Sequence, residues 1–192
     1  MVRAAPASAD PVDRWARQIG EASERFDIPE EWIRRVMRAE SGGRTRIDGR
    51  PVVSSAGAMG LMQLMPATWR AMRERFALGP DPHDPHDNIL AGTAYLRLMY
   101  DRFGYPGLFA AYNAGPARYA DYLSERRPLP PETLAYVASI SADGSAAASP
   151  VRHRSALFAV IGKGDTRSEP ARNAAAGVAG ELFVELNGAS GR

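Results

Sequence analysis

Apolar positions between residues 11 and 140 recur at the spacing of three and four residues that is typical of amphipathic helices. The clearest stripe lies in residues 12–26, after a helix-start pair at Asp10-Pro11, and consists of Val12, Trp15, Ile19, Ala22 and Phe26. Similar stripes predict helices over 28–41, 89–103, 108–114, 116–123 and 131–140, and one helix that carries Trp69, Met72 and Phe76. Because no segment alternates as a strand does, residues 11–140 are expected to form one all-α domain.

Two polar segments separate these helices. Residues 42–58 are rich in Gly, Ser, Asp and Pro and are expected to be a loop. Residues 79–88, GPDPHDPHDN, are expected to be a turn that ends at a helix N-cap, either Asp87 or Asn88. The histidines and aspartates of this turn suggest a metal site, but Pro82 and Pro85 are expected to keep its backbone extended. We therefore expect no metal ion.

The two ends of the chain differ from the helical part. Residues 1–10 are expected to be flexible; they lack the apolar segment of a signal peptide and resemble the residues that follow a cleaved leader. Residues 141–192 contain small-residue segments interrupted by Pro and Gly, and are expected to be a low-complexity, poorly structured tail. The apolar pieces of this tail, 157–161 and 182–186, are expected to pair as a short hairpin or to dock on the core.

Composition narrows the function classes. The 192 residues are 45% apolar and 24% charged, and no apolar run approaches the roughly 18 residues that a membrane-spanning helix needs. The formal net charge is only +2, and no dense run of arginines indicates a nucleic-acid-binding surface. The chain has no cysteine, which excludes disulfides, thiol nucleophiles and thiolate metal sites.

One carboxylate stands out from the helical pattern. Glu40 lies in the last turn of the helix over 28–41 and continues the apolar stripe of Ile33, Val36 and Met37, just before Gly42-Gly43 ends the helix. Burial and the negative end of the helix dipole would both raise the pKa of such a carboxyl, which suits a general acid. The alternative is that fraying of the helix end turns Glu40 toward solvent.

Three further stretches carry side chains that suit a binding cleft. In residues 57–66, GAMGLMQLMP, the amide of Gln63 lies among three methionines, which favours either an amide-binding ligand site or a Met-rich core segment. In AYNAGP, Tyr112 and Asn113 end a helix among small residues, which suits a cleft wall or a helix-packing corner. In PPETLAYV, Tyr136 lies one turn inside a helix.

The succession of Glu40-Ser41, GLMQLMP, AYNAGP and PETLAYV resembles the lytic transglycosylases related to the C-terminal domain of the soluble lytic transglycosylase. The resemblance covers about residues 20–140 and implies a lysozyme-like fold with a cleft for the N-acetylglucosamine and N-acetylmuramic acid of bacterial peptidoglycan. It implies Glu40 as the single catalytic acid, and as substrate-binding residues Ser54, Met62, Gln63, Tyr112, Asn113 and Tyr136. The sequence departs from the family at Ser55, where many relatives have proline, and in a longer loop over 44–53.

No second carboxylate is evident beside Glu40, whereas ordinary glycosidases pair two at about 5 to 9 Å. Asp48 lies in the loop, and Glu132 begins a helix. The resemblance therefore implies that Glu40 acts first as acid and then as base, with formation of 1,6-anhydromuramic acid and without a metal or cofactor. The alternatives are a hydrolytic muramidase of goose-lysozyme type and a non-catalytic glycan-binding module.

The resemblance also implies a setting. The expected partners are the glycan strands of peptidoglycan, for a monomer in the periplasm or cell envelope that binds no nucleic acid. Similar small enzymes accompany secretion or conjugation machines, so the tail after Ser141 is expected to contact such an apparatus.

Overall fold

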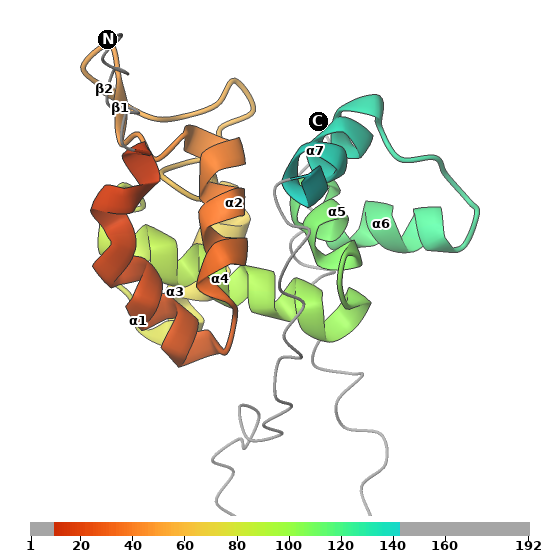
Figure 1. The fold of residues 1–192 in the computed structure, drawn as a ribbon, viewed down its shortest axis with the longest axis horizontal. Helices are drawn as coiled ribbons and strands as arrows, with labels where there is room; N and C mark the ends of the chain where they lie inside the picture. The colour runs from red at the N-terminus through yellow and green to blue at the C-terminus, as the bar shows by residue number, and fades with distance from the viewer. Residues whose placement is uncertain (1–9, 143–192) are drawn as a thin grey trace, which may run out of the picture. The chain divides into compact units, whose positions relative to one another are not determined.

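The computed structural model describes residues 10–142, and these residues are mainly helical. A 3-10 helix, Pro11–Trp15, precedes the first α-helix. The α-helices are α1 (Ala16–Phe26), α2 (Glu30–Ser41), α3 (Pro66–Phe76), α4 (Pro85–Phe103), α5 (Gly107–Ala114), α6 (Pro116–Leu123) and α7 (Pro131–Ala142) (Figure 1). The expected all-α fold class is confirmed, and the apolar stripes correctly predict where the helices lie.

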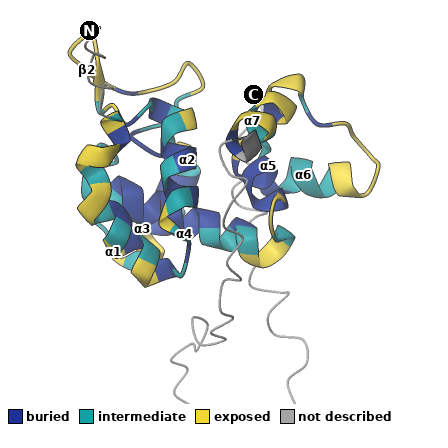
Figure 2. Cartoon of the chain, in the orientation of Figure 1, coloured by how far each residue is buried: buried dark blue, intermediate teal, exposed yellow. Residues whose placement is uncertain are grey.

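Helix α4 is the centre of the described part of the chain. It packs against α1 and α3, and also against α5, the helix that follows it in the sequence. Its side chains from Asn88 to Leu96 are all buried, so α4 is enclosed around its whole circumference along this stretch, which is dark in Figure 2. A helix enclosed in this way is the expected core element of a small helical domain.

Four of the five residues of the predicted stripe over 12–26 are buried as expected, Trp15 is half-buried, and the helix has two parts. Val12, Ile19, Ala22 and Phe26 are at most 1% exposed. Asp10 accepts a hydrogen bond from the Val12 amide at 2.9 Å and so begins the 3-10 turn before α1. The packing of this first segment supports the end of α2, whose C-terminal turn carries Glu40.

Two local expectations are corrected. The segment 42–58 is not only a loop, because β1 (Arg46–Ile47) and β2 (Arg50–Pro51) pair as a short antiparallel hairpin within it. The N-cap of α4 is Asp84, whose side chain accepts from the Asp87 amide at 3.0 Å. Proline is favourable in the first helical turn, so Pro85 begins the helix and Asp87 and Asn88 lie inside it.

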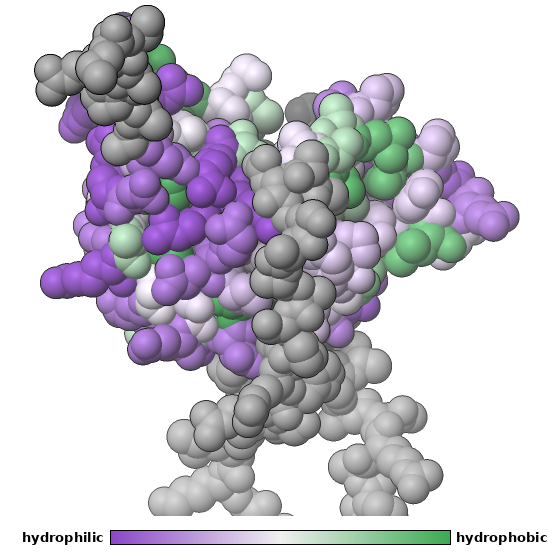
Figure 3. Space-filling view, in the orientation of Figure 1, coloured by the Kyte–Doolittle hydropathy of each residue, from purple (hydrophilic) through white to green (hydrophobic). Residues whose placement is uncertain are grey.

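The exposed surface has two characters in the view of Figure 3. Side chains over α1 and α2 are mostly hydrophilic, whereas hydrophobic side chains gather over α6 and α7, where Tyr122, Leu123 and Leu134 are all more than 40% exposed. Within residues 10–142, no helix is both long and apolar enough to cross a membrane. The hairpin expected between 157–161 and 182–186 lies outside the described residues.

Candidate active site

Glu40 lies inside the last turn of α2 and not on a frayed end. The helix continues to Ser41 and is ended by Gly42, whose φ of 60° is left-handed and whose amide bonds to the Arg38 carbonyl. Ile33, Val36 and Met37 of the same stripe are fully buried, and Glu40 is half-buried. Burial raises the pKa of Glu40 from 4.5 to about 7, so a large fraction of this carboxyl is protonated at neutral pH.

Two tyrosines flank the Glu40 carboxyl. Burial, with the nearby charge of Glu40, raises the pKa of both Tyr112 and Tyr136 well above the ordinary value. The Tyr136 hydroxyl in turn lowers the pKa of Glu40, against the larger effect of burial. This hydroxyl is buried and has no well-aligned hydrogen-bond partner among residues 10–142. It nevertheless lies close enough to the Glu40 carboxyl to act on it as a hydrogen-bond donor, and both phenolic groups remain neutral at neutral pH.

Hydrogen bonds join the separate motifs into one unit. The Ser41 hydroxyl donates to the Leu61 carbonyl at 2.8 Å. This bond fastens the end of α2 to the loop of residues 57–66, which contains the GLMQ motif and is called the GLMQ loop below. The Tyr112 hydroxyl donates to the Met62 carbonyl at 2.8 Å, which fastens α5 to the same loop. At the other side of α5, Thr133 donates to the Asn113 side chain at 2.8 Å and fixes α7, the helix of Tyr136. Segments far apart in the sequence are thus locked around Glu40.

Two of the expected substrate-binding side chains, Ser54 and Gln63, each form one hydrogen bond with the backbone of their own loop. Gln63 is half-buried with a left-handed φ of 48°, and its amide nitrogen donates to the Gly60 carbonyl at 2.8 Å. The Ser54 hydroxyl, which is exposed, accepts a hydrogen bond from the Ala58 amide at 3.0 Å. The Gln63 carbonyl and the Ser54 hydroxyl proton form no hydrogen bond within the part of the chain that the structure describes, so each keeps one polar function for a ligand.

Met62 does not lie where the resemblance implies. Its side chain is fully buried and packs so closely against Gly92 of α4 that a Cβ at Gly92 would collide with it. A side chain without accessible surface cannot touch a substrate, so the expected direct contact is corrected. Met62 instead positions the loop, because its amide and carbonyl bond to Asn88 and Tyr112. Asn113, by contrast, is exposed beside Tyr112.

The most important site residue that the sequence did not single out as such is Asn88. It has no exposed surface, and its side-chain oxygen accepts from the Met62 amide at 2.8 Å. Its side-chain nitrogen donates to the carbonyls of Met59 at 3.1 Å and Pro82 at 2.8 Å. Asn88 therefore holds this loop at Met59 and Met62 and joins it to the turn before α4. The signal in the sequence is a side-chain amide directly before the apolar run Ile89–Leu90, but such a residue equally predicts a helix N-cap.

No acidic side chain among residues 10–142 contributes to the pKa of Glu40. Asp48 is exposed in the turn of the β1–β2 hairpin, at a φ of 50°. Glu132 is exposed in the first turn of α7. The arrangement thus offers one carboxyl beside two neutral tyrosines, of which Tyr136 is the donor toward it, and not the pair of interacting carboxylates of an ordinary glycosidase.

The polar turn before α4 brings Asp84, His86 and Asp87 within 4.8 Å of one another. Each of these side chains already has a contact within the fold. Asp84 caps α4, Asp87 accepts from the Gly79 amide at 2.8 Å, and His86 bonds to Glu21 of α1 at 2.9 Å. The cluster thus joins α1 to the start of α4, and His83 takes no part in it.

Comparison with known proteins identifies the family of this chain. The model of the transglycosylase SLT domain family matches residues 17–134, and the chain belongs to this family. The chain is 36% identical over 104 residues to the soluble lytic murein transglycosylase of Escherichia coli strain K12, an alignment that covers 50% of this chain and 15% of that protein. It is 38% identical over 91 residues to the transglycosylase of Enterobacteria phage PRD1, covering 47% of this chain and 31% of that protein.

A solved structure shares the fold. The lytic transglycosylase Slt of Pseudomonas aeruginosa, solved as an inactive mutant in which a glutamate is replaced by glutamine, superposes with a TM-score of 0.56 at 28% identity. The superposition covers 65% of this chain and 22% of that one. The chain therefore corresponds to a minor part of the length of these relatives, the part that forms the SLT domain.

Proposed function

We propose that the chain is a peptidoglycan lytic transglycosylase that cleaves the β-1,4 bond between N-acetylmuramic acid and N-acetylglucosamine, and that Glu40 is its single acid and base. The observation that carries the proposal is the raised pKa of Glu40, to about 7, at a site where two neutral tyrosines and no second carboxylate influence it. The names of the E. coli and phage relatives and the inactivation of the P. aeruginosa enzyme by a Glu-to-Gln change support it.

The chemistry follows from one group that changes role. Protonated Glu40 gives its proton to the glycosidic oxygen, and the bond from that oxygen to C1 of muramic acid breaks as the 2-acetamido group stabilises the cationic centre. The Glu40 carboxylate then removes the proton from the C6 hydroxyl, whose oxygen attacks C1 and closes the 1,6-anhydro ring. Glu40 ends protonated, as it began, so no water is consumed. A pKa near the working pH serves both steps.

The remaining site residues act on the substrate or on Glu40. The exposed Ser54 hydroxyl and the free carbonyl of Gln63 hold the acetamido group, and the exposed amide of Asn113 binds the neighbouring sugar. Tyr112 and Met62 position the loop that carries Gln63. Tyr136 orients the Glu40 carboxyl and tunes its pKa.

The products test the proposed reaction. Purified peptidoglycan sacculi incubated with the full chain are expected to release muropeptides that end in 1,6-anhydromuramic acid, which mass spectrometry detects because they are lighter by one water than hydrolysis products. Reducing muropeptides in their place would show a hydrolytic muramidase. Binding to sacculi without any release would show a glycan-binding module, and either result contradicts the proposal.

Replacing Tyr136 by phenylalanine is expected to lower kcat by about 10-fold to 100-fold and to move the alkaline limb of the pH profile upward. The wild-type limb is set by loss of the Glu40 proton near pH 7, and the Tyr136 hydroxyl lowers the pKa of Glu40, so its removal raises that pKa. The measurement is the rate of anhydromuropeptide release between pH 5 and 9.

Tyr112→Phe is the matched control for this variant. Its hydroxyl bonds to the Met62 carbonyl, so its loss is expected to cost about 1–3 kcal/mol of stability. Tyr136→Phe removes a hydroxyl that acts on the Glu40 carboxyl with poor hydrogen-bond alignment, and it is expected to cost less stability than Tyr112→Phe. A downward shift of the alkaline limb in Tyr136→Phe would contradict the assigned role.

We propose that the protein acts in the cell envelope, where peptidoglycan lies, and that residues 11–140 are its catalytic domain. If it serves a secretion or conjugation apparatus, residues 141–192 are the segment for that contact. Capture of envelope proteins by the full chain and by a chain without these residues tests the second point. Recovery of the same proteins by both would remove the tail from this role.

A further inference from the structure

Arg35 is a buried cation on α2, the helix that carries Glu40, and it reaches α7. Its side chain is only 5% exposed, and a guanidinium is seldom buried to this extent unless its donors are paired. Its Nε donates to Glu31 of the same helix at 3.1 Å, and a terminal nitrogen donates to the Ile140 carbonyl at 3.4 Å. Ile140 lies in the last turn of α7, where backbone carbonyls lack a partner within the helix. Arg35 therefore supplies a missing donor and joins α2 to the C-terminal end of α7.

Helix α7 is thus held at both of its ends, and Tyr136 lies between the two points. In the first turn, the Thr133 hydroxyl bonds to Asn113 of α5 at 2.8 Å, and in the last turn Ile140 bonds to Arg35. The spacing of three and four residues places Thr133, Tyr136 and Ile140 on one face of the helix. The position of this face against α2 therefore decides where the Tyr136 hydroxyl lies.

Two contacts define an antiparallel register between α2 and α7. The distance along α2 from Arg35 to Glu40 is about 7.5 Å, and the distance along α7 from Ile140 back to Tyr136 is about 6 Å. Tyr136 consequently lies opposite the last turn of α2 when Arg35 is bonded to Ile140. The Tyr136 hydroxyl acts on the Glu40 carboxyl with poor alignment, so a small slide of α7 along α2 is enough to weaken this interaction.

We propose that Arg35 is a positioning residue for the reaction: it binds the C-terminal end of α7 and thereby holds the Tyr136 hydroxyl at the Glu40 carboxyl. The catalytic consequence rests on the proposed function, whereas the register of α7 against α2 does not. The titratable groups that face Glu40 are Tyr112 from α5 and Tyr136 from α7. Among residues 10–142 no charged side chain contributes to the pKa of Glu40, so Arg35 acts on it through α7 and not through its own charge.

The test is a direct titration of Glu40 that requires no turnover. The full chain is labelled with carbon-13 at the glutamate side-chain carboxyls and followed by NMR, and the Glu40 signal is identified by its absence from Glu40→Gln. The wild-type midpoint is expected at about pH 7. Because the Tyr136 hydroxyl lowers the Glu40 pKa, Tyr136→Phe and Arg35→Met are each expected to raise the midpoint. Arg35→Met added to Tyr136→Phe is expected to cause no further shift, because the hydroxyl that Arg35 positions is already gone.

The kinetics of Arg35→Met provide a second readout. The kcat for anhydromuropeptide release is expected to fall about threefold to tenfold, while KM for sacculi stays close to the wild-type value. The alkaline limb of the pH profile is expected to move upward together with the NMR midpoint. A residue that only stabilised the fold would lower the unfolding temperature without moving this limb.

Glu31→Ala reaches the same contact from a side chain that is 44% exposed, so the fold is expected to be retained even if Arg35→Met does not fold. It removes the acceptor that fixes the Arg35 guanidinium. Loss of a negative charge would by itself lower the Glu40 pKa, whereas loss of the Arg35 alignment raises it. The expected result is an upward shift of the midpoint, smaller than that of Arg35→Met.

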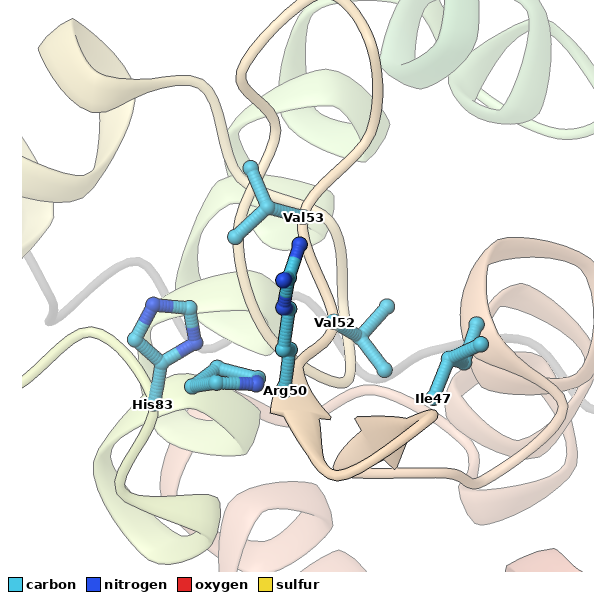
Figure 4. A pocket seen from close by; sticks show the side chains of 6 residues that line it. Ile47, Arg50, Val52, Val53 and His83 are labelled. Atoms are coloured by element: carbon cyan, nitrogen blue, oxygen red, sulfur yellow. The ribbon is translucent and has the colours of Figure 1, made fainter.

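Two arginines serve as matched controls. Arg34, next to Arg35 on α2, pairs with Asp13 and Glu30 and not with α7. Arg50 extends from the β1–β2 hairpin at the wall of a pocket of about 540 Å³ (Figure 4). The residues that line this pocket lie in the hairpin, directly after it and in the turn before α4. Arg34→Met and Arg50→Met each remove one cation and are expected to leave the Glu40 midpoint at its wild-type value.

An unchanged midpoint in Arg35→Met and Glu31→Ala would overturn the proposal. A shift caused by Arg35→Met that persists undiminished beside Tyr136→Phe would also overturn it, since Arg35 would then act without Tyr136. The expected shifts in a chain that releases no anhydromuropeptides would contradict only the proposed function. Anhydromuropeptide release by a chain in which neither variant shifts the midpoint would contradict only the role of Arg35.

Discussion

Replacing Glu40 by glutamine is expected to lower anhydromuropeptide release from sacculi by about a thousandfold or more while the fold is retained. General acid–base catalysis by one group is worth about 10² to 10⁴ in rate, and here the same carboxyl serves both proton transfers. Glutamine has nearly the same shape as protonated glutamate, so the packing at the end of α2 is preserved. The measurement is product release by mass spectrometry, with circular dichroism to verify the helical fold.

The same variant makes a prediction about stability. The Glu40 pKa is raised from 4.5 to about 7 on folding, so the folded protein disfavours the carboxylate. The contribution of protonated Glu40 to the free energy of unfolding is therefore fully present below pH 4.5. It decreases as the pH rises and is lost once the pH has passed about 7. Glu40→Gln does not titrate, and its advantage over the wild type is therefore expected to grow between these pH values, to at most about 3 kcal/mol.

Glu74→Gln, at an exposed position of α3, is the control for both measurements. It removes one carboxylate from the surface and is expected to leave product release and the pH dependence of unfolding close to those of the wild type. Undiminished anhydromuropeptide release by Glu40→Gln would refute the catalytic assignment. A stability difference between Glu40→Gln and wild type that is the same at pH 4.5 and pH 8 would refute the raised pKa of Glu40.

The sequence was sufficient to predict the helices because each carries a regular apolar stripe. Val12, Ile19 and Phe26 lie on one buried face as their spacing predicts. The β1–β2 hairpin escaped prediction because strands of two residues are too short to show alternation, and their residues are exposed on both sides. The early start of α4 does not show in the apolar spacing, because Pro85 and His86 precede the stripe, although proline is favourable as a first helical residue.

The burial of a site residue was predictable where it follows from apolar spacing along the residue's own helix. It was unpredictable where it depends on elements far away in the sequence. Glu40 belongs to a stripe whose buried face is visible in the sequence. Met62 shows the limit, because its burial depends on the absence of a side chain at Gly92, thirty residues further along. The central role of Asn88 likewise depends on where the carbonyls of Met59 and Pro82 lie in space, which spacing along the chain does not specify.

Replacing Gly60 by alanine is expected to be the most destabilising single-methyl change in the loop of residues 57–66, at about 3–5 kcal/mol. Gly60 has a φ of +74°, and a Cβ there would overlap the side-chain nitrogen of Asn88 and lie 2.8 Å from the Pro82 carbonyl. Left-handed strain costs about 1–2 kcal/mol, and displacement of Asn88 adds the loss of its bonds to Met62 and Met59.

Gly57→Ala distinguishes the cost of left-handed backbone strain from the cost of the collision with Asn88. Gly57 also has a left-handed φ, +86°, but nothing lies within 4 Å of the position that its Cβ would take. It therefore has the backbone strain without the collision, and its expected cost is about 1 kcal/mol. Both free energies are measured by urea unfolding of the full chain. Because the Asn88 bonds position Met62 and with it Gln63, Gly60→Ala is also expected to raise KM for sacculi more than Gly57→Ala does. Equal costs for the two variants would mean that strain alone, and not the contact between Gly60 and Asn88, governs this loop.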